Sequence, residues 1–159
     1  MYSLYSALLA LAFVLAVPYF LWKGRATGKY RVSFRERMGR LPPDLNRDGG
    51  PSIWIHAVSV CEVLTARVLL GPLRARFPDH RIVVSTTTVT GHGVACSSLG
   101  EADALFFAPF DFRGPVRKAL ATVKPRLLLL METELWTNLI HEARRAGVRG
   151  PDGPRPAEG

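Results

Sequence analysis

Two glutamates stand where a short apolar stretch gives way to polar residues. Glu62 follows the apolar stretch 52–57, and Glu132 follows residues 126–131, which contain four successive leucines. A carboxylate placed there can act as a general base toward a hydroxyl group. Glu132 directly follows an apolar strand, so we expect it to be partly desolvated, an environment that enzymes use to tune acids and bases. We interpret Glu62 and Glu132 as candidate catalytic residues, although Glu62 could equally stabilise the positive end of a helix.

A hydroxyl-rich turn lies between these two glutamates. Its residues are Thr86, Thr87, Thr88, Thr90 and Gly91, and they lead into an expected helix. Hydroxyls and free backbone amides at a helix start can hold an anion or a sugar. The same residues could simply cap the helix. Thr87, Thr88 and Gly91 are therefore candidate binding residues.

Other kinds of site have little support. The Gly91-His-Gly93 string lacks the third glycine of a dinucleotide-binding turn, and no P-loop sequence is present. Cys61 has no evident histidine partner, and the four histidines are scattered without metal-ligand spacing. We expect no metal site, no cofactor and two reduced cysteines.

The glutamates and the turn are set in an alternating pattern of strands and helices. This pattern predicts an α/β fold with a Rossmann-like parallel sheet and flanking helices, in which ligands bind outside the carboxyl ends of the strands. We expect the last strand to be buried on both faces. The expected strands are 52–57, 81–86, 104–108 and 126–131, and the expected helices are 62–77, 91–99, 114–123 and 134–146.

The amino-terminal part has a different composition. Residues 2–22 carry no charge and are long enough for a transmembrane anchor. Seven basic residues against one glutamate in 23–40 give +6 of the total net charge of +8. Positive flanks stay on the cytoplasmic side and attract anionic lipids, so we expect a membrane protein with a cytoplasmic domain and no nucleic acid partner. The expected divisions are the anchor 2–22, a basic segment and linker 23–51, a domain 52–147 and a disordered tail 148–159.

Four strings resemble one bacterial family, the 3-deoxy-D-manno-octulosonic acid (Kdo) transferases. Residues 53–62, IWIHAVSVCE, resemble its H-x-x-S-x-G-E motif, and residues 85–91, STTTVTG, resemble its T-T-T-x-T-G turn. Residues 131–136, METELW, match a string of the family, and residues 35–40, RERMGR, are similar to its E-R-x-G segment.

The resemblance implies the amino-terminal domain of a GT-B glycosyltransferase of the inner membrane. That family transfers Kdo from CMP-Kdo to lipid IVA, a bisphosphorylated precursor of lipopolysaccharide. It implies that Glu62 is the general base and Glu132 an active-site residue. The matched strings make Ser59, Thr87, Thr88 and Gly91 candidates for acceptor binding, and Arg35 and Arg37 suit a substrate with two phosphates.

The sequence also departs from the family. Cys61 replaces a glycine, and Val89 and Thr137 stand where proline is usual. After Val148 the family continues into a second domain that binds the CMP part of the donor, whereas the sequence here ends at Gly159. We therefore expect this chain to be inactive alone. The alternative is a non-catalytic, membrane-bound module that binds the acceptor, or a gene remnant.

Overall fold

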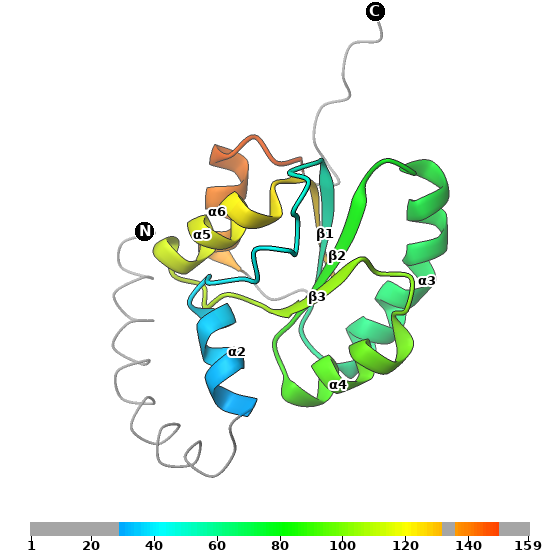
Figure 1. The fold of residues 1–159 in the computed structure, drawn as a ribbon, viewed down its shortest axis with the longest axis horizontal. Helices are drawn as coiled ribbons and strands as arrows, with labels where there is room; N and C mark the ends of the chain where they lie inside the picture. Colours follow the sequence, from blue (N-terminus) through cyan, green and yellow to red (C-terminus); the bar gives the residue numbers. More distant parts are fainter. Residues whose placement is uncertain (1–28, 132–135, 150–159) are drawn as a thin grey trace, which may run out of the picture.

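The computed structural model describes residues 29–131 and 136–149, which form an α/β fold (Figure 1). Its centre is a four-stranded parallel sheet in the order β3-β2-β1-β4. Helices α3 and α4 cover one face of the sheet, and α5 and α6 cover the other. The strands are β1 (Ser52–Ala57), β2 (Arg81–Thr86), β3 (Ala104–Phe107) and β4 (Pro125–Leu130). The helices are α2 (Lys29–Arg37), α3 (Val60–Arg76), α4 (Val89–Ser98), α5 (Arg113–Val123) and α6 (Thr137–Arg145).

The side chains of β1 alternate between two apolar cores. Ile53 and Ile55 face the core under α3 and α4, whereas Trp54 faces the core under α5 and α6. All three side chains are almost fully buried, because β1 lies inside the sheet and helices cover both faces of the sheet. The predicted parallel sheet with flanking helices is thus confirmed.

The predicted burial of the fourth strand on both faces is wrong. In β4, Arg126 is exposed and Leu127, Leu129 and Leu130 are only partly buried. The reason is that β4 ends the order of described strands and has a full neighbour, β1, on one side alone. Arg149 makes a short parallel bridge on its other side, where its carbonyl accepts from the Leu128 N–H at 3.0 Å.

That bridge also changes the expected boundary of the tail at residue 148. Val148 is buried, and the Arg149 N–H donates to the Arg126 carbonyl at 3.0 Å. The folded part therefore includes at least two more residues than expected. The rest of the expected tail, 150–159, lies outside the described residues.

The segment expected to be a linker packs onto the domain. Leu45 and Asn46 are buried, and Asn46 Nδ2 donates to the Val123 carbonyl at 2.9 Å. Val123 ends α5, so Asn46 satisfies a carbonyl that the helix itself leaves without a donor. The polar composition of this segment led to the expectation of a linker, but part of that polarity serves an internal contact.

No helix within 29–131 or 136–149 combines the length and apolar character needed to cross a bilayer. The anchor expected at 2–22 lies outside the described residues.

Candidate active site

Glu62 and Ser59 lie together at the start of α3. Ser59 is the N-cap of the helix, and its backbone N–H donates to Glu62 Oε2 at 2.6 Å. The Ser59 hydroxyl donates to the same oxygen. Glu62 is half-buried, in the first turn of a helix whose positive end favours a carboxylate. The capping role that the sequence left open is therefore present, and the same contacts hold the carboxylate in a defined place.

The hydroxyl-rich turn after β2 lies beside this carboxylate. Thr88 caps α4, since its Oγ1 accepts from the Gly91 N–H at 3.0 Å. The N–H groups of Thr87 and Thr88 both donate to the Val58 carbonyl, at 3.3 and 3.1 Å. Gly91 is buried against Ser59, and a Cβ atom there would lie 3.3 Å from the Ser59 carbonyl carbon. The structure thus brings Ser59, Glu62, Thr87, Thr88 and Gly91 together at the carboxyl edge of β1 and β2.

The two candidate arginines of α2 differ in their surroundings. Arg35 is exposed. Arg37 is half-buried, its guanidinium donates to the Thr87 carbonyl and lies 4.9 Å from the centre of the Phe107 ring. Burial lowers the pKa of Arg37, against the opposing effect of Glu36. Arg37 therefore makes an internal contact with the turn after β2, in addition to carrying charge.

Neighbouring Glu36 makes a second contact between α2 and the sheet. Its Oε2 accepts from the Phe107 N–H at 2.7 Å, at the end of β3. Burial raises the pKa of this carboxyl, although the bond to Phe107 and the charge of Arg37 act in the opposite direction. Two consecutive side chains of α2 thus bind the carboxyl ends of β2 and β3.

Two histidines at this edge were not predicted as site residues. His92 stacks on Phe107 with ring centres 4.1 Å apart, and its Nδ1 is hydrogen-bonded to Thr86 Oγ1 at 3.0 Å. Burial lowers the pKa of His92, and the nearby charge of Arg37 lowers it further. His92 therefore makes a contact between α4 and the end of β3 in surroundings that favour its neutral form.

His56 is fully buried at the end of β1. Its Nδ1 lies 2.8 Å from Ser85 Oγ, which accepts a hydrogen bond from Trp54 Nε1, also at 2.8 Å. The indole can only donate, so Ser85 Oγ accepts from Trp54, and its second hydrogen bond is the one shared with His56 Nδ1. Within the described residues Nε2 has no partner, and burial lowers the pKa of His56 to about 4.

Strand register is what brings His56 to Ser85. The two residues are direct partners in the parallel pairing of β1 with β2. The sequence contains both polar residues inside apolar strands, a pattern that could have marked them as partners, but the register could not be read from it.

Glu132 lies outside the described residues, so its predicted role stays a prediction. The preceding residue, Met131, is described, and its N–H donates to the His56 carbonyl at 2.9 Å. Asp111, in another loop at this edge, caps α6, since its oxygens accept from the N–H groups of Asn138 and Leu139 at 3.1 and 2.8 Å.

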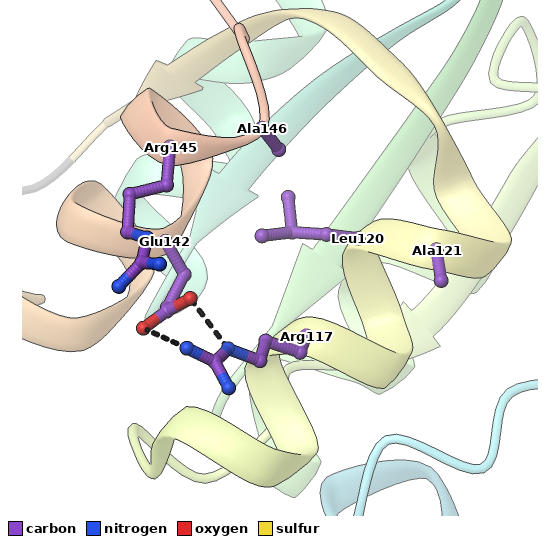
Figure 2. Close-up of a pocket in the computed structure, with 6 residues that line it drawn as sticks. All are labelled: Arg117, Leu120, Ala121, Glu142, Arg145 and Ala146. Atoms are coloured by element: carbon purple, nitrogen blue, oxygen red, sulfur yellow. Dashed lines mark hydrogen bonds and ion pairs between the residues drawn. The ribbon is translucent and has the colours of Figure 1, made fainter.

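A separate hollow of about 440 Å³ lies between α5 and α6 (Figure 2). Figure 2 shows Arg117 reaching Glu142 across it, and Arg113 also donates to this carboxylate. Its lining residues come from these two helices and from Ala146, which follows α6, on the face of the sheet opposite α3 and Glu62. Glu142 is therefore an internal ion-pair partner, and this hollow does not contain the candidate catalytic residues.

Comparison with known proteins gives a consistent result. The family described as 3-Deoxy-D-manno-octulosonic-acid transferase (kdotransferase) matches residues 32–150. A 3-deoxy-D-manno-octulosonic acid transferase of Chlamydia pneumoniae is 33% identical over 145 residues, which cover 91% of this chain and 33% of that protein. The Haemophilus influenzae transferase is 34% identical over 119 residues, 72% of this chain and 26% of its own length. A probable mitochondrial transferase of Arabidopsis thaliana is 32% identical over 142 residues, 89% of this chain and 31% of its own length. The chain spans about a third of the length of these relatives.

Proposed function

The chain belongs to the family of Kdo transferases, and we propose that it provides the acceptor-side domain for transfer of Kdo from CMP-Kdo to lipid IVA, with Glu62 as the general base. In this reaction the carboxylate takes the proton of an acceptor hydroxyl while that oxygen attacks the anomeric carbon of Kdo. Cytidine monophosphate leaves from the opposite side, which inverts the configuration. We propose Glu132 as a second carboxylate of the active site.

The observation that carries this proposal is the place of Glu62. The carboxylate is half-buried, fixed by the Ser59 N–H and directed by its helix to the carboxyl edge of a parallel sheet, where ligands of such folds bind. The turn that holds Thr87, Thr88 and Gly91 lies against the same Ser59. A base beside hydroxyls and backbone amides suits a sugar hydroxyl as the acceptor group.

We place this domain on the cytoplasmic face of the bacterial inner membrane, attached by the apolar residues 2–22. The basic residues that follow would lie at the headgroup level, where the exposed Arg35 could meet a phosphate of lipid IVA. This arrangement brings a membrane-embedded acceptor to the edge of the sheet that carries Glu62.

The test has two arms. In the first, the purified 159-residue chain is assayed for Kdo transfer from CMP-Kdo to lipid IVA, and we expect binding of lipid IVA without turnover. In the second, the chain replaces the matching third of the Chlamydia pneumoniae relative. We expect this chimera to transfer Kdo, and Glu62→Gln, which keeps the size of the side chain, to lower kcat by about a thousandfold.

Three results would contradict parts of the proposal. Turnover by the chain alone would show that the 159 residues suffice. An active Glu62→Gln chimera would remove Glu62 as the base. If the 159-residue chain binds lipid IVA but the chimera transfers no Kdo, the result would support the alternative function, a non-catalytic module that binds the acceptor.

A further inference from the structure

Arg37 is the last residue of α2 and touches the sheet with both its backbone and its side chain. Its carbonyl accepts from the Phe110 N–H at 2.7 Å, and its guanidinium lies 4.9 Å from the centre of the Phe107 ring and 5.8 Å from that of Phe110. The same guanidinium donates to the Thr87 carbonyl, fifty positions away in the sequence. The charge is thus held between two aromatic rings and one carbonyl, and is only partly exposed to water.

The Thr87 carbonyl belongs to a turn that is bonded onward to the start of α3. The N–H groups of Thr87 and Thr88 donate to the Val58 carbonyl, and the next residue, Ser59, binds Glu62 through its own N–H at 2.6 Å. A continuous series of contacts therefore runs from Arg37 through the turn and Val58 to Glu62. The series consists of the side-chain bond from Arg37 to Thr87, two backbone bonds to Val58, the peptide link to Ser59 and the capping bond to Glu62, so a shift of the turn moves the helix start that carries the carboxylate.

We propose that Arg37 is a positioning residue for Glu62: through the Thr87 carbonyl it fixes the turn after β2, and so couples helix α2 to the carboxylate at the start of α3. This inference rests on the proposed role of Glu62. The expectation that Arg37 binds an acceptor phosphate stays a separate prediction; its guanidinium already contacts Thr87 and two rings, and the KM for lipid IVA separates the two roles.

A lysine at this position keeps the charge but cannot reproduce the contact. The ammonium group has no plane to stack on Phe107 and is more strongly hydrated than a guanidinium, so it favours solvent over the half-buried place beside Thr87. Arg37→Lys therefore separates the positioning role from the positive charge. Arg144→Lys is the matched control, since Arg144 is exposed on α6 and away from the turn.

The first measurement is residue-resolved amide hydrogen exchange on the 159-residue chain. In Arg37→Lys we expect exchange about tenfold faster at Thr87, Thr88 and Ser59. Exchange at Ile55 and Val84 in the core strands should stay unchanged, which shows that the fold is intact. Arg37→Gln, which also removes the charge, should give the same pattern, and Arg144→Lys should match the wild type. Unchanged exchange at Ser59, with faster exchange at Thr87, would overturn the coupling.

The second measurement is steady-state transfer by the chimera described above. If Arg37 positions the base, Arg37→Lys lowers kcat by about tenfold and leaves the KM for lipid IVA within twofold. A raised KM with unchanged kcat would make Arg37 a ligand of the acceptor and overturn the inference. If the wild-type chimera transfers no Kdo, the proposed function fails, while the exchange experiment still decides whether Arg37 fixes Ser59.

Discussion

Gly91 packs against the backbone of Ser59 so closely that a side chain at position 91 would make an unusually tight contact with it. A Cβ atom built on Gly91 would lie 3.3 Å from the Ser59 carbonyl carbon and 2.8 Å from Thr88 Oγ1. This contact joins the start of α4 to the start of α3, and so joins the turn after β2 to the N-cap that binds Glu62. The glycine of the family's T-T-T-x-T-G turn thus has a steric reason in this chain.

We predict that Gly91→Ala destabilises the protein by about 1–3 kcal/mol, because the added methyl group must displace the capping hydroxyl of Thr88 or the backbone of Ser59. Urea unfolding measures the loss. The matched control is Gly93→Ala in the same helix, where a Cβ atom meets nothing within 4 Å. That variant should gain about 0.5–1 kcal/mol from the better helix propensity of alanine. Equal stabilities of the two variants would contradict the proposed contact.

Val89→Pro should stabilise the protein. Val89 is the first residue of α4 and is exposed, and no hydrogen bond of its N–H is found among the described residues. Proline suits this position, and Thr88 already has the extended backbone, φ −89° and ψ 148°, that a following proline requires. We expect a gain of about 0.4–1 kcal/mol from the lower entropy of the unfolded chain, measured as a higher midpoint of thermal unfolding.

The sequence predicted the fold better than it predicted the site. The strands β1 and β2 have the bounds expected from their apolar, β-favouring runs. Helix α3 begins two residues earlier than expected, because Ser59 caps it. The burial of β4 could not be predicted, since four leucines in a row look alike in a central strand and at the end of a sheet.

The arrangement around Glu62 depends on contacts between residues far apart in the sequence. Spacing alone placed Glu62 and the threonine turn at one edge of the sheet, because the carboxyl ends of parallel strands meet there. In the sequence alone, Arg37 is one of the seven basic residues in 23–40. Its contact with Thr87 could not be predicted, because that contact exists only after α2 has packed on β3. His56 was missed because the strand register decides its partner.

His56 should make the protein less stable in mild acid. Its folded-state pKa of about 4 lies below the ordinary value of 6.5, so the unfolded chain binds this proton first as the pH falls. The loss of stability begins near pH 6.5 and is complete near pH 4. Between pH 7 and pH 4.5 we expect it to reach about 2–3 kcal/mol.

Urea unfolding at several pH values, with the wild type and His56→Asn, tests this expectation. Asparagine keeps a polar group, able to donate or accept, near the position of Nδ1 for the Ser85 hydroxyl but does not titrate. The stability of His56→Asn should fall by about 2–3 kcal/mol less than that of the wild type over the same interval. The same decrease in both proteins would assign the acid sensitivity to other groups.

Glu142 also has a lowered folded-state pKa, but here the shift reflects stabilisation of the charged form. The hydrogen bonds and charges of Arg117 and Arg113 hold its pKa at about 2, below the ordinary value of 4.5, although burial acts against them. Because the folded-state pKa is lowered, the contribution is complete above about pH 4.5 and is lost as the pH falls toward 2. Glu142→Gln should therefore cost about 1–3 kcal/mol at pH 7, and the difference from the wild type should shrink with acid.

The salt dependence of the stability distinguishes this ion pair from apolar packing between α5 and α6. Arg113 and Arg117 are about half exposed, with side-chain exposures of 45% and 53%. The side chain of Glu142 is buried, with only 4% of its surface exposed. Ions can screen the outer side of the contact, so the cost of Glu142→Gln should be smaller in 1 M NaCl than in 0.1 M. The control is Glu101→Gln, an exposed acidic residue whose replacement should change stability by less than about 0.5 kcal/mol. If Glu142→Gln matched this control at pH 7, the two arginines would hold Glu142 without stabilising the packing of α5 on α6.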